Sequence, residues 1–342
     1  MAAADSDKRK IQMIDIARMA GVSTSTVSRA LNGSALINEE TRRRISELAK
    51  SLNYTINQSA KNLRIGDNRT IGVVIPYDRK SRQHISDPFF LGMLGSLADA
   101  LTDHNYDLLL SRVDADRMED LSSLYDTGRV SAIIVIGQWG HHEELNELAR
   151  RQVPMVVWGA QLPRQMYCSV GSDNLDGGRQ ATEHLLRLQR KRIVFLGDTS
   201  MPEAAQRYEG YCLAHKNAGL AISSDLYVAC PFTASEAQKV TSDFLDMGVE
   251  FDAIVAASDV IAINAMGVLK NAGIAIPEQV SVVGYDDIDL SSHSFPPLTT
   301  VRQPLDQAGQ VIMQCLIDIL DGKAVDSQLL PTSLIVRGTT TF

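Results

Sequence analysis

Small hydroxyl side chains and one arginine are concentrated near the start of the chain. Thr24, Ser25, Thr26, Ser28 and Arg29 all lie within one short segment. On the exposed start of a helix, such side chains exchange hydrogen bonds with base edges without holding the helix out of a DNA major groove. The alternative is an ordinary surface helix whose hydroxyl groups only meet water. The segment therefore has the chemistry of a nucleic-acid reader, provided that its neighbours form a helix-turn-helix.

The residues around this segment predict a small three-helix unit. Residues 14–32 read as a helix, a tight turn at Gly21 and a second helix that Ser23 caps. Asn38 is placed to cap a third helix over 39–52, where apolar side chains recur at helical spacing. The side chains expected in the core are Ile14, Ile16, Ala17 and Ala20 on the first helix, Val27, Ala30 and Leu31 on the second, and Ile45, Leu48, Ala49 and Leu52 on the third.

The charge of the chain is divided unevenly. Of the 342 residues, 44% are hydrophobic and 22% are charged, as in a globular protein, and the net charge is −8. Residues 1–70 contain 12 Lys and Arg against 7 Asp and Glu, whereas the remainder contains 21 against 34. A basic start on an acidic body confines the attraction for DNA phosphates to one end of the chain.

The sequence also gives an expectation for the cellular compartment. The four cysteines, Cys168, Cys212, Cys230 and Cys315, have neither disulfide nor metal-ligand spacing, which favours reduced thiols. The start has no apolar run typical of a signal peptide, and no stretch approaches the 18 apolar residues of a membrane span. We therefore expect a cytoplasmic protein without a membrane partner.

From residue 71 onward, short β-branched runs alternate with amphipathic helices. This alternation predicts parallel sheets covered by helices on both faces, and the number of strands favours two doubly wound α/β lobes. Parallel sheets bind ligands at the carboxyl ends of their strands, so two facing lobes would place a small-molecule site in the cleft between them. The expected strands are 71–75, 107–110, 132–136, 155–158, 192–196, 226–230, 253–257 and 280–284, and the expected helices are 90–104, 143–151, 177–188, 203–218, 235–247 and 260–272.

Aromatic side chains lie near the ends of several of these strands. Phe89, Phe90, Trp139, Trp158 and Phe232 are the candidates to form the walls of the cleft. Aromatic faces stack on the C–H faces of sugar rings and equally on purines. The alternative for each of them is plain core, where Phe and Trp are common.

Seven motifs, in order along the chain, carry a resemblance to a known family. From residue 13 to the end, the chain resembles the lactose-repressor/galactose-repressor (LacI/GalR) family of bacterial transcription regulators. The motifs are the run Asp15 to Asn32, the run Asn53 to Leu63, Asp87-Pro-Phe-Phe, Arg207-Tyr-Glu-Gly-Tyr, Ser281-Val-Val-Gly-Tyr-Asp-Asp, Pro297-Leu-Thr-Thr-Val and Leu330-Pro-Thr-Ser-Leu-Ile-Val-Arg.

The resemblance implies an α/β protein in two parts. An all-α helix-turn-helix DNA-binding domain would span residues 1–66, ending in a hinge helix at about 55–66. A two-lobed, periplasmic-binding-protein-like effector and dimerisation domain would span 67–342. Lobe 1 is expected at about 70–171 and 304–331, and lobe 2 at about 172–303 and 332–342.

Residue roles in DNA binding follow from the family motif. Thr24, Ser25 and Arg29 would reach base edges, and a bidentate contact from Arg29 to guanine is worth about 1–3 kcal/mol of discrimination. Thr26, Ser28 and Asn32 would contact the DNA backbone.

The hinge is matched by Asn57, Ala60 and Leu63. In the family, paired leucines of two subunits wedge into a minor-groove step. For Leu63, the alternative is a buried residue at the base of the lobe. A paired wedge implies a homodimer on a pseudo-palindromic operator.

The family positions also imply a ligand set in the cleft. Asp286 matches a carboxylate and Arg207 a guanidinium that clamp the ligand from opposite walls, and each can bind a pair of sugar hydroxyls in bidentate fashion. The alternative for both is a structural salt bridge or a helix cap. Gln303, on a segment that crosses between the lobes, is expected to hydrogen-bond the ligand. The full candidate set is Asp87, Phe89, Phe90, Trp139, Trp158, Arg207, Phe232, Ser258, Asp286 and Gln303.

Two positions depart from the pattern of sugar-binding relatives. Ser258 stands where those relatives often carry Asn, and Gly159 stands where an Asp is common. The segment 77–87 is also longer than usual, and we hypothesise that it roofs the cleft for a larger ligand such as a disaccharide. These departures leave the identity of the sugar open.

The expected function is a DNA-binding repressor of carbohydrate-utilisation genes that a sugar effector releases from its operator. Two alternatives remain: a repressor that uses a purine or another small metabolite as corepressor, and a solute-binding protein without a DNA function.

Catalytic motifs for nucleotide, acyl-transfer or zinc chemistry are missing, so we expect no enzyme and no cofactor. The cluster His141 to Glu144 is read as a solvated helix start rather than a metal site, because adjacent helical residues diverge by about 100°.

Overall fold

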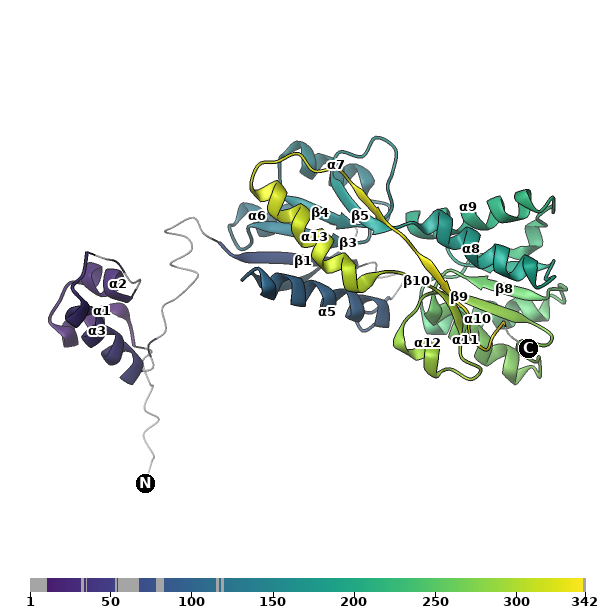
Figure 1. The fold of residues 1–342 in the computed structure, drawn as a ribbon, viewed down its shortest axis with the longest axis horizontal. Helices are drawn as coiled ribbons and strands as arrows, with labels where there is room; N and C mark the ends of the chain where they lie inside the picture. Colours follow the sequence, from purple (N-terminus) through teal and green to yellow (C-terminus); the bar gives the residue numbers. More distant parts are fainter. Residues whose placement is uncertain are drawn as a thin grey trace, which may run out of the picture. The chain divides into compact units, whose positions relative to one another are not determined.

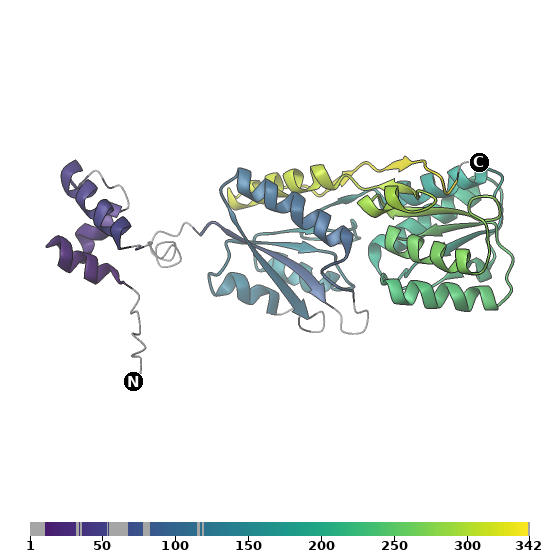
Figure 2. The ribbon, with the colours of Figure 1, turned by 90° about the horizontal axis from the view of Figure 1, so that it is seen from below.

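The structure is a computed structural model that describes residues 11–31, 34, 36–52, 54, 68–77, 83–114, 117 and 120–340. The chain divides into two compact units, Met1–Asn68 and Arg69–Phe342, which are the helical unit and the body drawn in Figures 1 and 2. In the described parts of the chain, no helix is both long and apolar enough to cross a membrane.

The described helices of the first unit form a helix-turn-helix followed by a third helix. They are α1 (Met13–Ala20), α2 (Thr24–Leu31) and α3 (Glu39–Ser51). Gly21 adopts φ 66° at the end of α1, a conformation that favours glycine. Ser23 Oγ accepts a hydrogen bond from the backbone N–H of Thr26 at 3.1 Å, and Asn38 Oδ1 accepts one from that of Thr41 at 2.7 Å. The predicted turn and both predicted caps are confirmed.

One side chain from each helix fills the centre of this unit. Ile16, Val27 and Ile45 are fully buried. The prediction that Ile14 belongs to the same core is wrong, because its side chain is 49% exposed. Residues two apart point about 200° from one another on a helix, so Ile14 and Ile16 do not share a face.

The body contains two six-stranded sheets within its described residues. The first has the order β11-β5-β4-β3-β1-β2, and the second has the order β12-β10-β9-β8-β6-β7. Neighbouring strands are parallel except β10 and β12, which are antiparallel. The strands are β1 (Thr70–Tyr77), β2 (Asp107–Asp114), β3 (Ala132–Ile136), β4 (Met155–Trp158), β5 (Cys168–Ser172), β6 (Ile193–Leu196), β7 (Tyr227–Val228), β8 (Ala253–Ala256), β9 (Ser281–Asp286), β10 (Thr299–Arg302), β11 (Gln328–Leu330) and β12 (Ser333–Ile335).

Helices cover both sheets. In lobe 1, α5 (Pro88–Asp103) and α13 (Leu305–Leu320) lie side by side on one face, and α6 (Asp120–Asp126) and α7 (His142–Arg150) pack on the other (Figures 1 and 2). Lobe 2 carries α8 (Asn174–Arg187), α9 (Pro202–Asn217), η2 (Ser224–Leu226), α10 (Ala234–Asp246), α11 (Asp259–Asn271) and α12 (Asp289–His293). The central strands are buried along their whole length, as expected of parallel sheets covered on two faces.

The chain passes between the two sheets at three places in the described body: after β5, after β10 and after β11. The last of these is the extended segment that runs from lobe 1 to lobe 2 in Figure 1. The expected limits of the lobes stay a proposal. The limit between residues 66 and 67 and the expected hinge helix at 55–66 lie outside the described residues.

Helices α8 and α9 approach each other closely through glycines. A Cβ atom added at Gly178 would lie 2.0 Å from the backbone oxygen of Arg207, and one at Gly210 would lie 2.0 Å from that of Leu175. Any side chain at these positions would push α9 away from α8. The two glycines therefore set the position of α9, which carries Arg207.

We expect Gly178→Ala to destabilise the body by about 1–3 kcal/mol, because overpacking forces backbone shifts. Urea unfolding followed by far-UV circular dichroism measures this. Gly267→Ala is the control, since Gly267 also lies in a helix but a Cβ there meets no atom within 4 Å. Replacing that glycine should be neutral or stabilising by about 0.5–1 kcal/mol. Equal stability of Gly178→Ala and the native chain would contradict the packing argument.

Candidate nucleic-acid interface and ligand cleft

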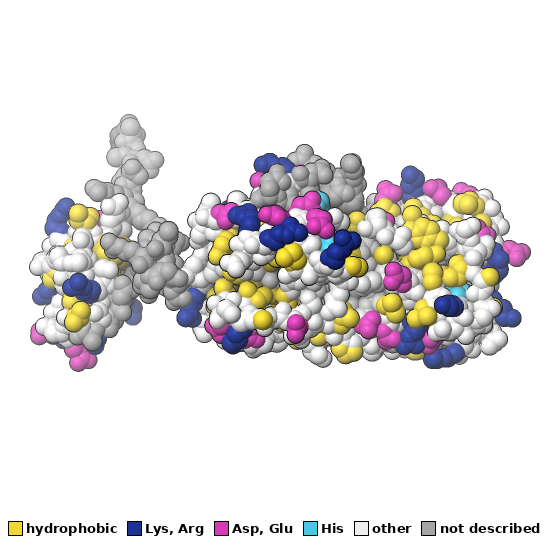
Figure 3. Space-filling view, turned by 90° about the horizontal axis from the view of Figure 1, so that it is seen from above, with side chains coloured by type: hydrophobic (Ala, Val, Ile, Leu, Met, Phe, Trp, Pro, Cys, Tyr) yellow, Lys and Arg dark blue, Asp and Glu magenta, His cyan; other side chains and the backbone are white. Residues whose placement is uncertain are grey.

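The start of α2 presents the predicted DNA-reading side chains to solvent. Thr24, Ser25 and Arg29 are exposed, whereas Thr26 and Ser28 are half-buried. This division agrees with the predicted roles, in which the exposed residues reach base edges. Figure 3 shows Lys and Arg side chains on the surface of the helical unit. The DNA contacts of these residues stay predictions, and Asn32, Asn57, Ala60 and Leu63 lie outside the described residues.

The structure brings all ten predicted ligand residues around one cavity of the body. The cavity holds about 670 Å³ of empty space, part of which is open to solvent. Lobe 1 contributes Asp87, Phe89, Phe90, Trp139 and Trp158, and lobe 2 and its crossing segment contribute Arg207, Phe232, Ser258, Asp286 and Gln303.

Asp286 is the buried acid of this cavity. It is the last residue of β9 and only 6% exposed. Gln303 Nε2 donates a hydrogen bond to its Oδ1 at 2.7 Å, and Ser172 Oγ donates to Gln303 Oε1 at 2.7 Å. Burial raises the pKa of Asp286 well above its usual value, and the charge of Arg207 opposes this shift. A ligand that donates hydrogen bonds to Asp286 would stabilise the charged form of this acid.

Arg207 lies in the same lobe as Asp286, and several contacts hold its guanidinium in place. Its Nε donates to Asn174 Oδ1 at 2.8 Å, and its Nη1 donates to the backbone oxygen of Ala257. The guanidinium also lies 3.7 Å from the ring centre of Tyr285, in cation–π geometry. Fixing the guanidinium in advance lowers the entropy lost when a ligand binds.

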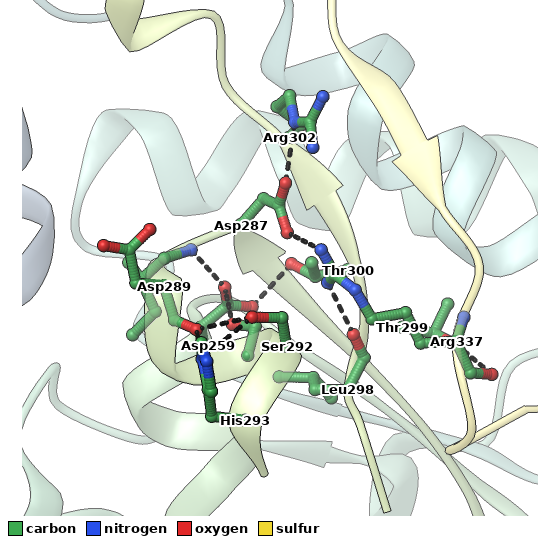
Figure 4. A network of polar contacts seen from close by, with 12 residues as sticks. Asp259, Asp287, Asp289, Ser292, His293, Leu298, Thr299, Thr300, Arg302 and Arg337 are labelled. Atoms are coloured by element: carbon green, nitrogen blue, oxygen red, sulfur yellow. Dashed lines mark hydrogen bonds and ion pairs between the residues drawn. The ribbon is translucent and has the colours of Figure 1, made fainter.

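A second layer of polar contacts fixes the turn after β9 (Figure 4). Asp287 accepts hydrogen bonds from Arg302 Nε and Arg337 Nη2, both at 2.6 Å. Asp259 accepts one from Thr300 Oγ1 at 2.5 Å, and it also accepts from the Ile288 N–H at 3.0 Å and from Ser291 Oγ at 2.5 Å. These contacts hold the residues that follow Asp286 in the chain.

Three residues at the cavity have backbone angles that L-amino acids rarely adopt. Trp139 has φ 48°, Asp286 has φ 120° and Asp287 has φ 58°. Such strain persists where the surrounding contacts outweigh it, and it is common at functional sites. Gly137 leaves room for the indole, because a Cβ there would lie 2.6 Å from Trp139 Nε1.

Two predicted ligand residues also cap helices. Asp87 Oδ1 accepts the backbone N–H of Phe89 at 3.0 Å at the start of α5, and Gln83 donates to Asp87 Oδ2 at 3.2 Å. Ser258 Oγ accepts the N–H of Ile261 at 3.2 Å at the start of α11. Burial raises the pKa of Asp87, while these N–H donors oppose the shift.

Sequence reasoning missed five residues that line the cavity: Gln83, Ile136, Gly137, Met201 and Glu203. Ile136 and Gly137 come at the end of a predicted strand, so the rule that ligands bind at strand ends would have found them. Glu203 lies four residues before Arg207 on α9 and therefore shares its helical face. Gln83 lies in the segment 77–87, which we hypothesise to roof the cleft, and its side chain lines the cavity. Residues 78–82 of this segment lie outside the described residues.

The comparisons with known proteins cover both units. Residues 12–57 match the family described as bacterial regulatory proteins, lacI family, and residues 182–340 match a periplasmic binding protein-like domain. Over 333 residues, the chain is 30% identical to the HTH-type transcriptional repressor CytR of Escherichia coli strain K12, with 96% of each chain covered. The chain belongs to the LacI family.

Two solved structures of LacI-type regulators resemble the chain over nearly its full length. The Lac repressor dimer bound to operator and the anti-inducer ONPF matches with a TM-score of 0.84 at 26% identity, covering 97% of this chain and 99% of that one. The complex of the transcriptional regulator CelR with cellobiose matches with a TM-score of 0.71 at 28% identity, covering 96% and 99%. The predicted family and fold class are confirmed, and these relatives are transcription regulators rather than enzymes.

The buried acid behind the cavity gives a pH prediction. Burial raises the pKa of Asp259 from 3.8 to about 6, although the three hydrogen bonds that this carboxylate accepts act to lower it. A carboxyl with a higher pKa in the folded state holds its proton more tightly there, so the folded state loses stability as the pH rises from about 4 to about 6. Relative to Asp259→Asn, the native chain should therefore lose about 1–3 kcal/mol over this range and remain level above it.

Urea unfolding of both proteins at a series of pH values measures this difference. Asp289→Asn, which changes an exposed acid on neighbouring α12, is the control and should leave the pH dependence of the native chain unchanged. A difference between native chain and Asp259→Asn that grows in favour of the native chain with rising pH would contradict the argument.

Proposed function

We propose that this LacI-family protein is a cytoplasmic repressor of carbohydrate-utilisation genes. It binds a pseudo-palindromic operator as a homodimer, and a sugar or glycoside bound between the lobes releases it. The observation that carries the proposal is that ten residues predicted from the sequence surround one cavity, in a chain that also has an exposed helix-turn-helix.

The helical unit supplies the sequence-reading part of the function. Thr24, Ser25 and Arg29 are exposed on the first two turns of α2, the part of a recognition helix that meets base edges. Thr26, Ser28 and Asn32 would hold the DNA backbone, and Asn57, Ala60 and Leu63 would form the hinge that enters the minor groove.

The cavity supplies the sensing part. Asp286 and Arg207 can each take a pair of hydroxyls, and Gln303 can share a third hydrogen bond with the ligand. Phe90 and Trp158, both 4% exposed, give the apolar faces that a pyranose ring stacks against. The related CelR structure is a complex with cellobiose, which supports a sugar or glycoside as the ligand of this chain.

Binding is coupled to DNA release through the arrangement of the lobes. A ligand shifts the balance between two lobe arrangements only by the difference between its binding free energies for them. This difference is typically about 1–3 kcal/mol. The sugar would favour the arrangement in which the paired hinges separate and the hold on the operator weakens.

We expect Arg29→Ala to lose operator discrimination by about 1–3 kcal/mol, because its guanidinium reads a base. A symmetric duplex selected by the native protein from a random library serves as the operator, and fluorescence anisotropy compares it with single-base variants. Arg43→Ala, an exposed arginine on α3, is the matched control and should weaken all duplexes alike. Full discrimination by Arg29→Ala would refute the role given to this residue.

We expect one or more sugars to raise the thermal midpoint of the native protein and to leave Asp286→Asn unchanged. A ligand at a hundred times its dissociation constant stabilises by about 2.7 kcal/mol. The screen contains mono- and disaccharides, α- and β-glucosides, nucleosides and purines. Asp289→Asn is the control, because it removes a nearby exposed acid. Stabilisation by purines alone would support the corepressor alternative, and a normal sugar response of Asp286→Asn would refute the cleft assignment.

A further inference from the structure

Glu203 is an acid of the cavity that the family motifs did not identify. It lies in the first turn of α9 in lobe 2 and is partly buried. Its Oε1 lies 3.1 Å from the place a Cβ would occupy at Gly159, the residue after β4 in lobe 1. Its carboxylate lies beside the backbone N–H groups of Gln138 and Ala160, which also belong to lobe 1. The carboxylate of Glu203 therefore lies between the two lobes, at the edge of the cavity.

Among the described residues, the charged side chains that line the cavity are three acids and one base. Asp87, Glu203 and Asp286 face a single cation, Arg207. That cation already donates hydrogen bonds to Asn174 and Ala257, and its charge lies close to Asp286. Its charge also acts on Glu203, so the two acids Glu203 and Asp286 share one cation. Among the described residues that line the cavity, Asp87 has no basic partner.

Both of these acids are desolvated by the protein around them. Burial raises the pKa of Asp87 and of Glu203. Neighbouring N–H groups oppose the shift for each, and the charge of Arg207 also opposes it for Glu203. A partly desolvated carboxylate is stabilised by hydrogen-bond donors and repels a second anion strongly, because little water screens the interaction. A ligand that carries a phosphate would bring two further charges to this place.

The two acids differ in what else they do. Asp87 caps α5 through the N–H of Phe89 and also binds Gln83, so its replacement would disturb the helix. Glu203 also lies beside backbone N–H groups, its own in the first turn of α9 and those of Gln138 and Ala160. Glutamine has nearly the same shape and keeps an oxygen that accepts hydrogen bonds, so Glu203→Gln changes the charge of the cavity while these contacts can remain.

We propose that Glu203 is a specificity-determining residue, which together with Asp87 restricts the effector to an uncharged ligand rich in hydrogen-bond donors and rejects the phosphorylated form of the same ligand. This inference deepens the proposed function and depends on its assignment of the cavity as the effector site.

The charge of the cavity can be measured without knowing the effector. Trp139 and Trp158 are the only two tryptophans of the sequence, and both line the cavity, so tryptophan emission reports on this place. Quenching by iodide, an anion, is compared with quenching by uncharged acrylamide. We expect Glu203→Gln to raise the ratio of iodide to acrylamide quenching at least two-fold. Glu203→Ala should change it in the same direction.

Glu209→Gln is the matched control, because Glu209 lies on the same helix but is exposed and outside the cavity lining. Its ratio should equal that of the native chain. Far-UV circular dichroism checks that each variant is folded. An unchanged iodide ratio in both Glu203 variants would overturn the proposal.

Matched ligand pairs then test the specificity itself. Calorimetric titrations compare ribose with ribose 5-phosphate, glucose with glucose 6-phosphate, and cytidine with its 5′-monophosphate. For any pair that binds, the native protein should prefer the unphosphorylated member at least ten-fold, and Glu203→Gln should reduce this preference. Equal or tighter binding of the phosphorylated member by the native protein would overturn the inference. If no pair binds, the carbohydrate function loses its support, while the quenching experiment still decides the role of Glu203.

Discussion

The cost of burying a carboxylate at the end of β9 is the constraint around which the cavity is built. Asp286 is almost fully buried, so its charge must be met by donors or by a cation. Gln303 donates one hydrogen bond, and Arg207 supplies positive charge from α9. Each of these partners is held in turn, Gln303 by Ser172 and Arg207 by Asn174. A ligand rich in hydroxyl groups would complete the coordination that the protein itself leaves partial.

The strained turn after β9 shows how this acid is kept in place. Two successive residues, Asp286 and Asp287, have positive φ, and each such position costs of the order of 1–3 kcal/mol. The contacts of Asp287 with Arg302 and Arg337, and those of Asp259 with the same turn, offset this cost. Because these partners come from β10, α11 and the segment after β12, the turn is rigid only when lobe 2 is fully folded.

The sequence predicted those parts of the structure that depend on local pattern. The caps at Ser23 and Asn38 and the alternation of strands and helices followed from spacing. The ten cavity residues followed from the family resemblance and from aromatic residues near the ends of predicted strands. The strands β5 and β10 were missed because they contain buried Ser and Thr, which become compatible with a core only through tertiary hydrogen bonds such as Thr300 to Asp259. Helix α13 was also missed, although its sequence is apolar along one side. Glu203 escaped because no family motif contains it, although its spacing of four residues from Arg207 places both on one face of α9.

The crossing segments connect the chemistry of the cavity to the arrangement of the lobes. Gln303 lies in the crossing between β10 and α13, and its two hydrogen bonds join Asp286 of lobe 2 to Ser172 at the crossing after β5. A ligand that competes for Asp286 would therefore change a contact at the place where the chain crosses between the lobes. The energy available for such a change is the difference in ligand affinity between lobe arrangements, about 1–3 kcal/mol, or roughly five- to 150-fold in DNA affinity. A single shared hydrogen bond to a charged group, at about 1.5–3 kcal/mol, is of the right size to account for it.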